Sequence, residues 1–287
     1  MVGINKAISA NDIKNGTSVT GVDGTGNMQS YFDTSKDVTT PALADIQSKY
    51  DTRFDDPTYY MHSGLIKDLV SYYRLDEESG VRINSVIGAT DLTDNNTVGF
   101  SADGVSSKTE NCADFVAANE EYLSHGGAEL RLGDSDWSIS AWIFHPNTSS
   151  NQDVVGIWKT PYNNREWRLW YRTSVSSYQF EISSNGESGG VSTVQSGAVS
   201  HDTWYNHIIV HNSVNNTIKY YINGSLKNTT SHSGGAFEGD GQFRMGHTFS
   251  SSDFFDGKID EFGVWSRVIS ARDISDLYNN GDGRKVK

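Results

Sequence analysis

Apolar and polar residues alternate along most of the chain from residue 65 onward, in short runs separated by turn-forming residues. The side chains of a β-strand point to opposite faces in turn, so an alternation with a period of two predicts strands that bury one face. Eleven such runs follow one another with no long helical pattern between them: 69–75, 112–117, 121–125, 137–144, 153–159, 166–172, 178–183, 204–211, 217–223, 242–247 and 257–266. This succession predicts an all-β fold, an antiparallel β-sandwich.

The turns between these runs carry the residues that tight turns require. Asn215 and Asn216 stand between two runs and can take the positive φ angles of a hairpin turn, and Asn223-Gly224 marks the turn that follows. After the last run, Ser270 and Asp273 have the spacing of a capping box. They predict a short C-terminal helix whose apolar stripe lies on the sandwich; the stripe consists of Ile274, Leu277 and Tyr278.

The closing run 257–266 contains the acidic pair Asp260-Glu261. Strict alternation divides this run into two groups, Asp260, Phe262 and Val264 on one face and Ile259, Glu261 and Gly263 on the other. Three roles are open for Asp260: accepting hydrogen bonds from neighbouring backbone amides, ligating a metal, or catalysis. We favour the structural role.

The run 166–172, "EWRLWYR", supplies the candidate ligand or interface residues. Alternation places Trp167, Leu169 and Tyr171 in the core, and Arg168, Trp170 and Arg172 together on an outer, solvated face. An outward tryptophan is apolar area available to a partner. Three readings stay open for Trp170: cover by a loop or the N-terminal arm, contact with a neighbouring subunit, or stacking on a sugar.

In residues 1–62, short apolar residues are separated by Gly-rich turns, unlike the repeated strand pattern of the rest of the chain. This difference predicts a separate N-terminal arm in residues 1–62 and the sandwich in residues 63–287. The arm has few large apolar residues, and Thr40 and Pro41 predict one short helix in it. A segment of this kind is marginal alone. We therefore expect it to anchor on other subunits through four short apolar residues: Ile8, Ile13, Val19 and Val22.

The composition limits the classes of partner that the protein is expected to bind. The formal net charge of −13 argues against nucleic acid and against an anionic bilayer, because both would be repelled. No run approaches the length of a membrane span, and the first residues lack the apolar stretch of a secretory signal. The single cysteine, Cys112, can form no intrachain disulfide and is expected to be a buried, inert thiol.

Five segments in order resemble the laminin G-like, concanavalin A-like jelly-roll family over residues 65–283. They are "LVSYYRLDEESG", "CADFVAANEEYLSH", "WSISAWIF", "TWYNHIIVHNSVNNTIKYYINGS" and "FDGKIDEFGVWSRVISARDISDLY". The resemblance implies a jelly roll closed by the last strand and helix. It does not imply one ligand, since the fold serves lectins, adhesins, enzyme appendages and virion proteins.

The laminarinase relatives of this fold carry a Glu, Asp, Glu series on one strand face. Here Lys258 and Phe262 stand two residues before and after Asp260, so the series is missing and we expect no catalytic activity. His207 and His211 would lie about 13 Å apart along a strand, too far to share a metal. Other jelly rolls bind Ca²⁺ through rim carboxylates, so Ca²⁺ is possible and no other cofactor is expected; the candidates are Asp134, Asp136, Asp153, Asp240 and Asp256.

The arm segment 11–27 and the segments "SYYRLDEESG", "EYLS" and "HSGGAFEG" resemble bacteriophage virion proteins. This resemblance implies a virion protein, either a capsid decoration or head-fibre protein or a tail-fibre adhesin. Its arm would bind other virion subunits, and its jelly roll would bind host surface glycans or neighbouring subunits, in a homo-oligomer. The alternative is a cellular or secreted carbohydrate-binding module without catalytic activity.

Overall fold

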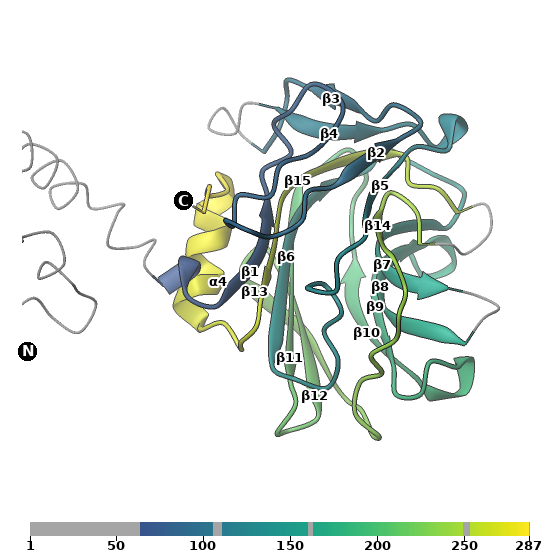
Figure 1. The fold of residues 1–287 in the computed structure, drawn as a ribbon, viewed down its shortest axis with the longest axis vertical. Coiled ribbons are helices and arrows are strands. Elements are labelled where there is room, and N and C mark those ends of the chain that lie inside the picture. The colour runs from purple at the N-terminus through teal and green to yellow at the C-terminus, as the bar shows by residue number, and fades with distance from the viewer. Residues whose placement is uncertain (1–63, 106–110, 160–162, 249–252, 287) are drawn as a thin grey trace, which may run out of the picture. The chain divides into compact units, whose positions relative to one another are not determined.

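The alternating segments fold into two antiparallel sheets that pack face to face (Figure 1). The structure is a computed structural model and describes residues 64–105, 111–159, 163–248 and 253–286. The chain divides into two units, Met1–Met61 and His62–Lys287, and all the described residues belong to the second. The helix predicted at Thr40 and the anchor residues Ile8, Ile13, Val19 and Val22 lie outside the described residues. The predicted all-β sandwich with a short C-terminal helix is confirmed.

The first sheet has eight strands, in the order β13-β12-β11-β6-β15-β4-β3, with β1 pairing to β15 beside β4. Its strands are β1 (Leu69–Tyr73), β3 (Gly99–Ser101), β4 (Cys112–Phe115), β6 (Trp137–Phe144), β11 (Tyr205–Asn212), β12 (Thr217–Ile222), β13 (Ser225–Ser231) and β15 (Gly257–Trp265). The last strand in sequence therefore lies in the middle of this sheet.

The second sheet has seven strands, in the order β10-β9-β8-β7-β14-β5-β2. They are β2 (Thr93–Asn95), β5 (Tyr122–His125), β7 (Gln152–Lys159), β8 (Asn164–Arg172), β9 (Ser177–Ser183), β10 (Val191–Ala198) and β14 (Phe243–Met245). In the described ranges, four 3-10 turns join strands or follow the C-terminal helix: η2 (Ala117–Asn119), η3 (Thr173–Val175), η4 (Ser188–Gly190) and η5 (Asn279–Gly281).

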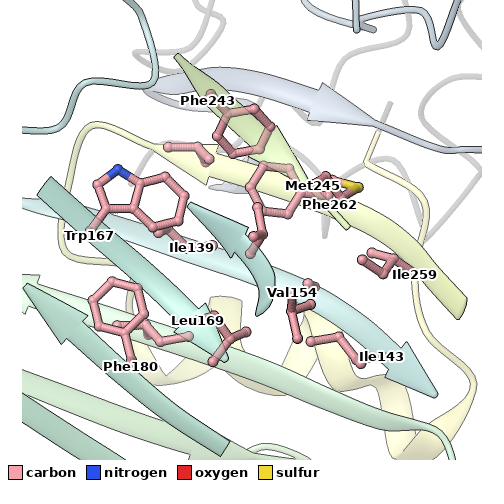
Figure 2. Close-up of a cluster of buried hydrophobic side chains, with 14 of the residues drawn as sticks. Ile139, Ile143, Val154, Trp167, Leu169, Phe180, Phe243, Met245, Ile259 and Phe262 are labelled. Carbon is pink, nitrogen blue, oxygen red and sulfur yellow. The ribbon is translucent and has the colours of Figure 1, made fainter. Parts of the chain in front are cut away.

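The inward side chains of both sheets form one apolar core (Figure 2). Trp167, Leu169 and Tyr171 belong to it, as the alternation in 166–172 predicts. Trp167 packs between the rings of Phe180 and Phe243, with ring centroids 6.0 and 5.9 Å away. Burial of this apolar area is the main stabilising contribution to the sandwich.

The outer face of the eight-stranded sheet carries a second, smaller core beneath helix α4 (Ala271–Tyr278). Ser270 caps the helix, and the side chain of Asp273 accepts a hydrogen bond from the backbone of Ser270, which completes the predicted capping box. Ile274 and Leu277 are buried, and Tyr278 stacks on Trp142 with ring centroids 6.0 Å apart. The helix thus closes this face of the sheet, as Figure 1 shows.

The strict alternation predicted for the closing strand is wrong. Ile259, Phe262 and Val264 all belong to the core, although Ile259 and Phe262 are an odd number of residues apart. The reason is a bulge: Glu261 has a φ of 50°, and the register between β15 and β6 shifts between Asp260 and Gly263. One extra residue on β15 returns the later residues to the core face.

The acidic pair at this bulge is buried. Asp260 accepts a hydrogen bond from the backbone amide of Val105 at 3.0 Å, in keeping with the structural role that we favoured. Glu261 is 3% exposed, and neither of its carboxylate oxygens has a hydrogen-bond partner among the described residues. Burial raises the pKa of Glu261 to about 8, and the charge of Lys285 opposes the rise.

Four strands escaped the sequence pattern: β2, β3, β10 and β13. All are short or polar, and β13 is exposed along nearly its whole length because it forms an edge of its sheet. In the hairpin turn at Asn215-Asn216, only Asn216 has a positive φ, of 49°. In the next turn, both Asn223 and Gly224 have a positive φ.

Cys112 is buried, as predicted, and burial holds the pKa of its thiol far above its ordinary value. In the described part of the chain, no helix has both the length and the apolar character needed to cross a membrane.

Replacing Leu277 by alanine should lower the free energy of unfolding by about 2–5 kcal/mol, because it removes a buried side chain between α4 and the sheet and leaves a cavity. Chemical denaturation of the purified protein measures the change. Arg272→Ala on the same helix is the control, since the Arg272 side chain is 72% exposed. Equal stability of Leu277→Ala and Arg272→Ala would show that α4 is not packed as described.

Glu261→Gln should stabilise the protein, and the gain should grow with pH. Because the folded-state pKa lies above the unfolded value of 4.5, the folded state keeps a proton between pH 4.5 and about 8 that the unfolded chain releases. Stability of the wild type therefore falls as pH rises through this window, and the uncharged glutamine removes the fall. The gain should increase by on the order of 3 kcal/mol from about pH 5 to about pH 8.

Urea denaturation at several pH values measures this gain, with Glu187→Gln as the control because Glu187 is exposed. A constant difference between Glu261→Gln and wild type across the pH range would contradict the burial of an uncompensated carboxyl.

Candidate functional site

A row of side chains crosses the outer face of the eight-stranded sheet at the end of β6, beyond the part covered by α4. Lys258 of β15 pairs with Phe144 of β6 on one side and with Asp114 of β4 on the other, and Asp114 pairs with Gly99 of β3. Phe144 points outward because its neighbour Ile143 belongs to the core. The pairing of Tyr205 with Ile143 extends the row to Trp204.

The turn before β11 holds Trp204 in this row. Asp202 has a φ of 55°, and its amide donates to the backbone carbonyl of His145, just beyond β6, at 3.0 Å. A side-chain contact also connects the turn to His145, because His201 Nδ1 lies 2.9 Å from His145 Nε2. The turn is thus tied to the end of β6, and the rings of Trp204 and Phe144 lie 5.7 Å apart.

Polar groups surround the two rings. The Lys258 ammonium lies 5.2 Å from the centre of the Phe144 ring and contacts both carboxylate oxygens of Asp103, at 2.8 and 2.6 Å. The Trp204 indole N–H donates to the backbone carbonyl of Asp103 at 3.3 Å. The hydrogen bond from Lys258 lowers the pKa of Asp103, so this largely exposed carboxyl is ionised at neutral pH.

Trp204 differs from the other tryptophans of the chain in its exposure. Six of the seven are buried, with exposed fractions from 0% to 8%, and they are Trp137, Trp142, Trp158, Trp167, Trp170 and Trp265. Trp204 is half-buried, and so is its neighbour Phe144. Trp204 is therefore the tryptophan whose ring is most open to a ligand.

Trp170 lies on the outer face of the seven-stranded sheet, opposite the core residues, as predicted. It is only 8% exposed, so its ring is covered by other groups rather than open to solvent. The guanidinium of Arg168 lies 4.1 Å from the ring centre and that of Arg172 5.8 Å. Arg168 also lies 4.7 Å from the ring of Trp158, and such cation–π contacts cover the indole faces that a sugar would need.

Arg168 also forms ion pairs with carboxylates on this outer face. It forms ion pairs with Asp153 at 3.1 Å and with Glu181 at 2.9 Å. Glu166, two residues before Arg168, is 1% exposed, and burial raises its pKa to about 7. Asp153, Glu166 and Glu181 thus face the same side of the sheet, and all three are buried.

The histidines form pairs that spacing along the chain did not reveal. His211 and His232 come together, with 2.9 Å between their Nε2 atoms, and His145 joins His201. His207 instead contacts the hydroxyl of Tyr220 at 2.8 Å. His145, His207 and His211 are buried, and burial lowers the pKa of each.

The carboxylates considered for Ca²⁺ have separate partners. Asp136 accepts from Ser213, Asp240 from Asn164, and Asp256 from the amide of Ala117. Across the ranges that the structure describes, no three His, Cys, Asp or Glu side chains are grouped to hold a metal ion. Ca²⁺ binding stays a prediction.

Sequence reasoning did not single out Trp204 as a candidate site residue. The sequence did contain a signal for its position. Trp204 directly follows the polar turn "SHDT" and directly precedes a strand, which places it at an end of the sheet. The partners Phe144, Lys258 and Asp103 come from segments far apart in the sequence, so only pairing of the strands joins them.

The fold is similar to that of toxin binding domains in solved structures. The binding domain of Paraclostridial Mosquitocidal Protein 1 is 14% identical, with a TM-score of 0.60 over 77% of this chain and 53% of that one. A structure of botulinum neurotoxin type C, whose cell entry depends on two ganglioside molecules, is 13% identical, with a TM-score of 0.56 over 78% and 53%.

The binding domain of botulinum neurotoxin DC, in complex with rat synaptotagmin II, is also 13% identical, with a TM-score of 0.55 over 75% of this chain and 52% of that one. The chain spans about half the length of these structures. At such identities the likeness shows the fold alone. No curated protein matches the sequence, and the comparisons do not support the phage part of the predicted resemblance.

The family, in contrast, is shown by the sequence itself. The family model described as the Concanavalin A-like lectin/glucanases superfamily matches residues 117–275, more than half of the chain. The match runs from η2 into α4 and so includes Phe144, Trp204 and Lys258. With the two-sheet sandwich and the helix that closes it, this match establishes that the chain belongs to the Concanavalin A-like lectin/glucanases superfamily.

Proposed function

We propose that this domain binds glycans without hydrolysing them, and that the sugar stacks on Trp204 and Phe144. The observation that carries the proposal is the exposure of Trp204, the tryptophan left open while six others are buried. The flat apolar face of a pyranose needs an open aromatic ring, and a small set of polar groups beside the ring then fixes its orientation.

The polar groups beside these rings suit hydroxyl ligands. The Asp103 carboxylate accepts hydrogen bonds from sugar hydroxyls, and the Lys258 ammonium donates to a hydroxyl or to the ring oxygen. Their ion pair holds both groups in place before the ligand arrives. The indole N–H of Trp204 is already used by the Asp103 carbonyl, which fixes the plane of the ring.

Family and fold support a binding role. The family includes lectins by its description, and two of the similar toxin structures concern a ganglioside and a protein receptor. Of these two kinds of ligand, a glycan is the one that fits the exposed rings of Trp204 and Phe144. A protein ligand at the same surface is the competing outcome.

Three features support a domain without catalysis. A glycosidase needs two carboxyl groups that flank the scissile bond and reach it. On the seven-stranded sheet, Asp153 is 0% and Glu166 1% exposed, and Arg168 pairs with both Asp153 and Glu181. At the proposed site, Asp103 is held by Lys258 and its pKa is lowered, which makes it a poor proton donor.

The virion role stays a prediction. It rests on the arm in residues 1–62 and on three short segments of the sandwich, and the anchor residues lie outside the described residues. Of the two functions weighed from the sequence, the comparisons favour the carbohydrate-binding module.

Trp204→Ala should weaken glycan binding by at least about tenfold, because the stacking surface is lost. The fold should be retained, since the ring is half-buried and outside both cores. An array of oligosaccharides identifies a ligand for the wild type, and isothermal titration calorimetry compares the variants. Trp170→Phe is the matched control: it changes a buried tryptophan on the other sheet and should alter stability more than affinity. Loss of binding in Trp170→Phe but not in Trp204→Ala would move the site to the seven-stranded sheet.

The wild-type protein should leave its glycan ligand intact on prolonged incubation, because Asp153 and Glu166 are buried and Lys258 holds Asp103 in its ionised form. Chromatography of the oligosaccharide after incubation measures this directly. Release of shorter products that is abolished by Glu166→Gln or Asp103→Asn would contradict a purely binding role.

A further inference from the structure

The charges around Trp204 and Phe144 are unequal. Asp114 lies opposite Lys258 in the strand pairing and is influenced by its charge, and Asp103 contacts the Lys258 ammonium directly, so two carboxylates lie near one cation. Asp256 and Glu121 add further negative charge, since both act on Asp114. Within the described residues, Lys258 is the one cation that acts on Asp114, against three carboxylates.

The state of these groups agrees with a negative local potential. Burial raises the pKa of Asp114, and the carboxylates of Asp103, Glu121 and Asp256 raise it further, while Lys258 lowers it. Both oxygens of Asp103 already contact the Lys258 ammonium. An anion that binds Lys258 would have to compete with Asp103, and Asp114 lies opposite Lys258 on the neighbouring strand.

We infer that the site at Trp204 and Phe144 selects neutral sugars and excludes sugars that carry a carboxylate, sulfate or phosphate. The inference rests on the proposed glycan binding and adds its ligand class. Asp103 and Asp114 determine this specificity, because Asp103 contacts Lys258 beside the Phe144 ring and Asp114 lies opposite Lys258 on the neighbouring strand. Repulsion between like charges is a means of rejecting the wrong ligand without loss of contacts to the right one.

A matched pair of ligands tests the inference on the full chain. The first is a neutral oligosaccharide that binds in a Trp204-dependent manner, and the second is the same oligosaccharide with its terminal hexose replaced by the hexuronic acid. The wild type should bind the neutral ligand more tightly, by on the order of tenfold at low salt. Salt should reduce the difference, since it screens charges near the surface.

Variants assign the exclusion to its residues. Asp114→Asn and Asp103→Asn should each bring the two affinities closer, chiefly by improving binding of the acidic ligand. Glu187→Gln is the control, because it removes one negative charge from the exposed turn between β9 and β10 on the other sheet. It should leave the ratio of the two affinities unchanged.

The outcomes separate this inference from the proposed function. Equal or tighter binding of the acidic ligand by the wild type, still abolished by Trp204→Ala, would overturn the selection of neutral sugars and leave glycan binding intact. A ratio that Glu187→Gln changes as much as Asp114→Asn would assign the effect to net charge rather than to the site. Absence of any Trp204-dependent glycan would instead refute the proposed function.

Discussion

The pairing of β15 with β6, with one extra residue at Glu261, is the constraint on which the rest of this domain depends. β15 lies at the centre of its sheet and pairs with β6 along one edge and with β4 and β1 along the other. Without the bulge, either Ile259 or Phe262 would leave the core. The bulge keeps both inside, while Lys258 and Asp260, on either side of Ile259, point outward by simple alternation.

Several features of the outer face follow from that register. Asp260 holds the amide of Val105, and Trp265 donates to the carbonyl of Leu65, which ties the segment before β1 to the closing strand. Lys258 stands between Phe144 and Asp114 because it precedes the bulge. The cost of the arrangement is a buried carboxyl at Glu261, whose burial favours its neutral form.

The two sheets treat their outer faces differently. On the eight-stranded sheet, α4 covers one part and leaves the row at Trp204 uncovered by the helix. On the seven-stranded sheet, guanidinium groups lie against Trp158 and Trp170, and Arg168 in turn binds Asp153 and Glu181. An aromatic ring that packs against guanidinium groups contributes to the stability of the domain, whereas an exposed ring is available to a partner.

The sequence alone determined most of the strands, the two faces of β8 and the capped helix, because each follows from local periodicity or from hydrogen bonds between near neighbours. Trp167, Leu169 and Tyr171 could therefore be assigned to the core without a structure. Only the tertiary structure decided the register across the bulge, the burial of Trp170 and the meeting of Trp204 with Phe144, Lys258 and Asp103. The physical reason is distance along the chain: alternation says which way a side chain points, and strand pairing between remote segments decides what covers it and which groups lie beside it.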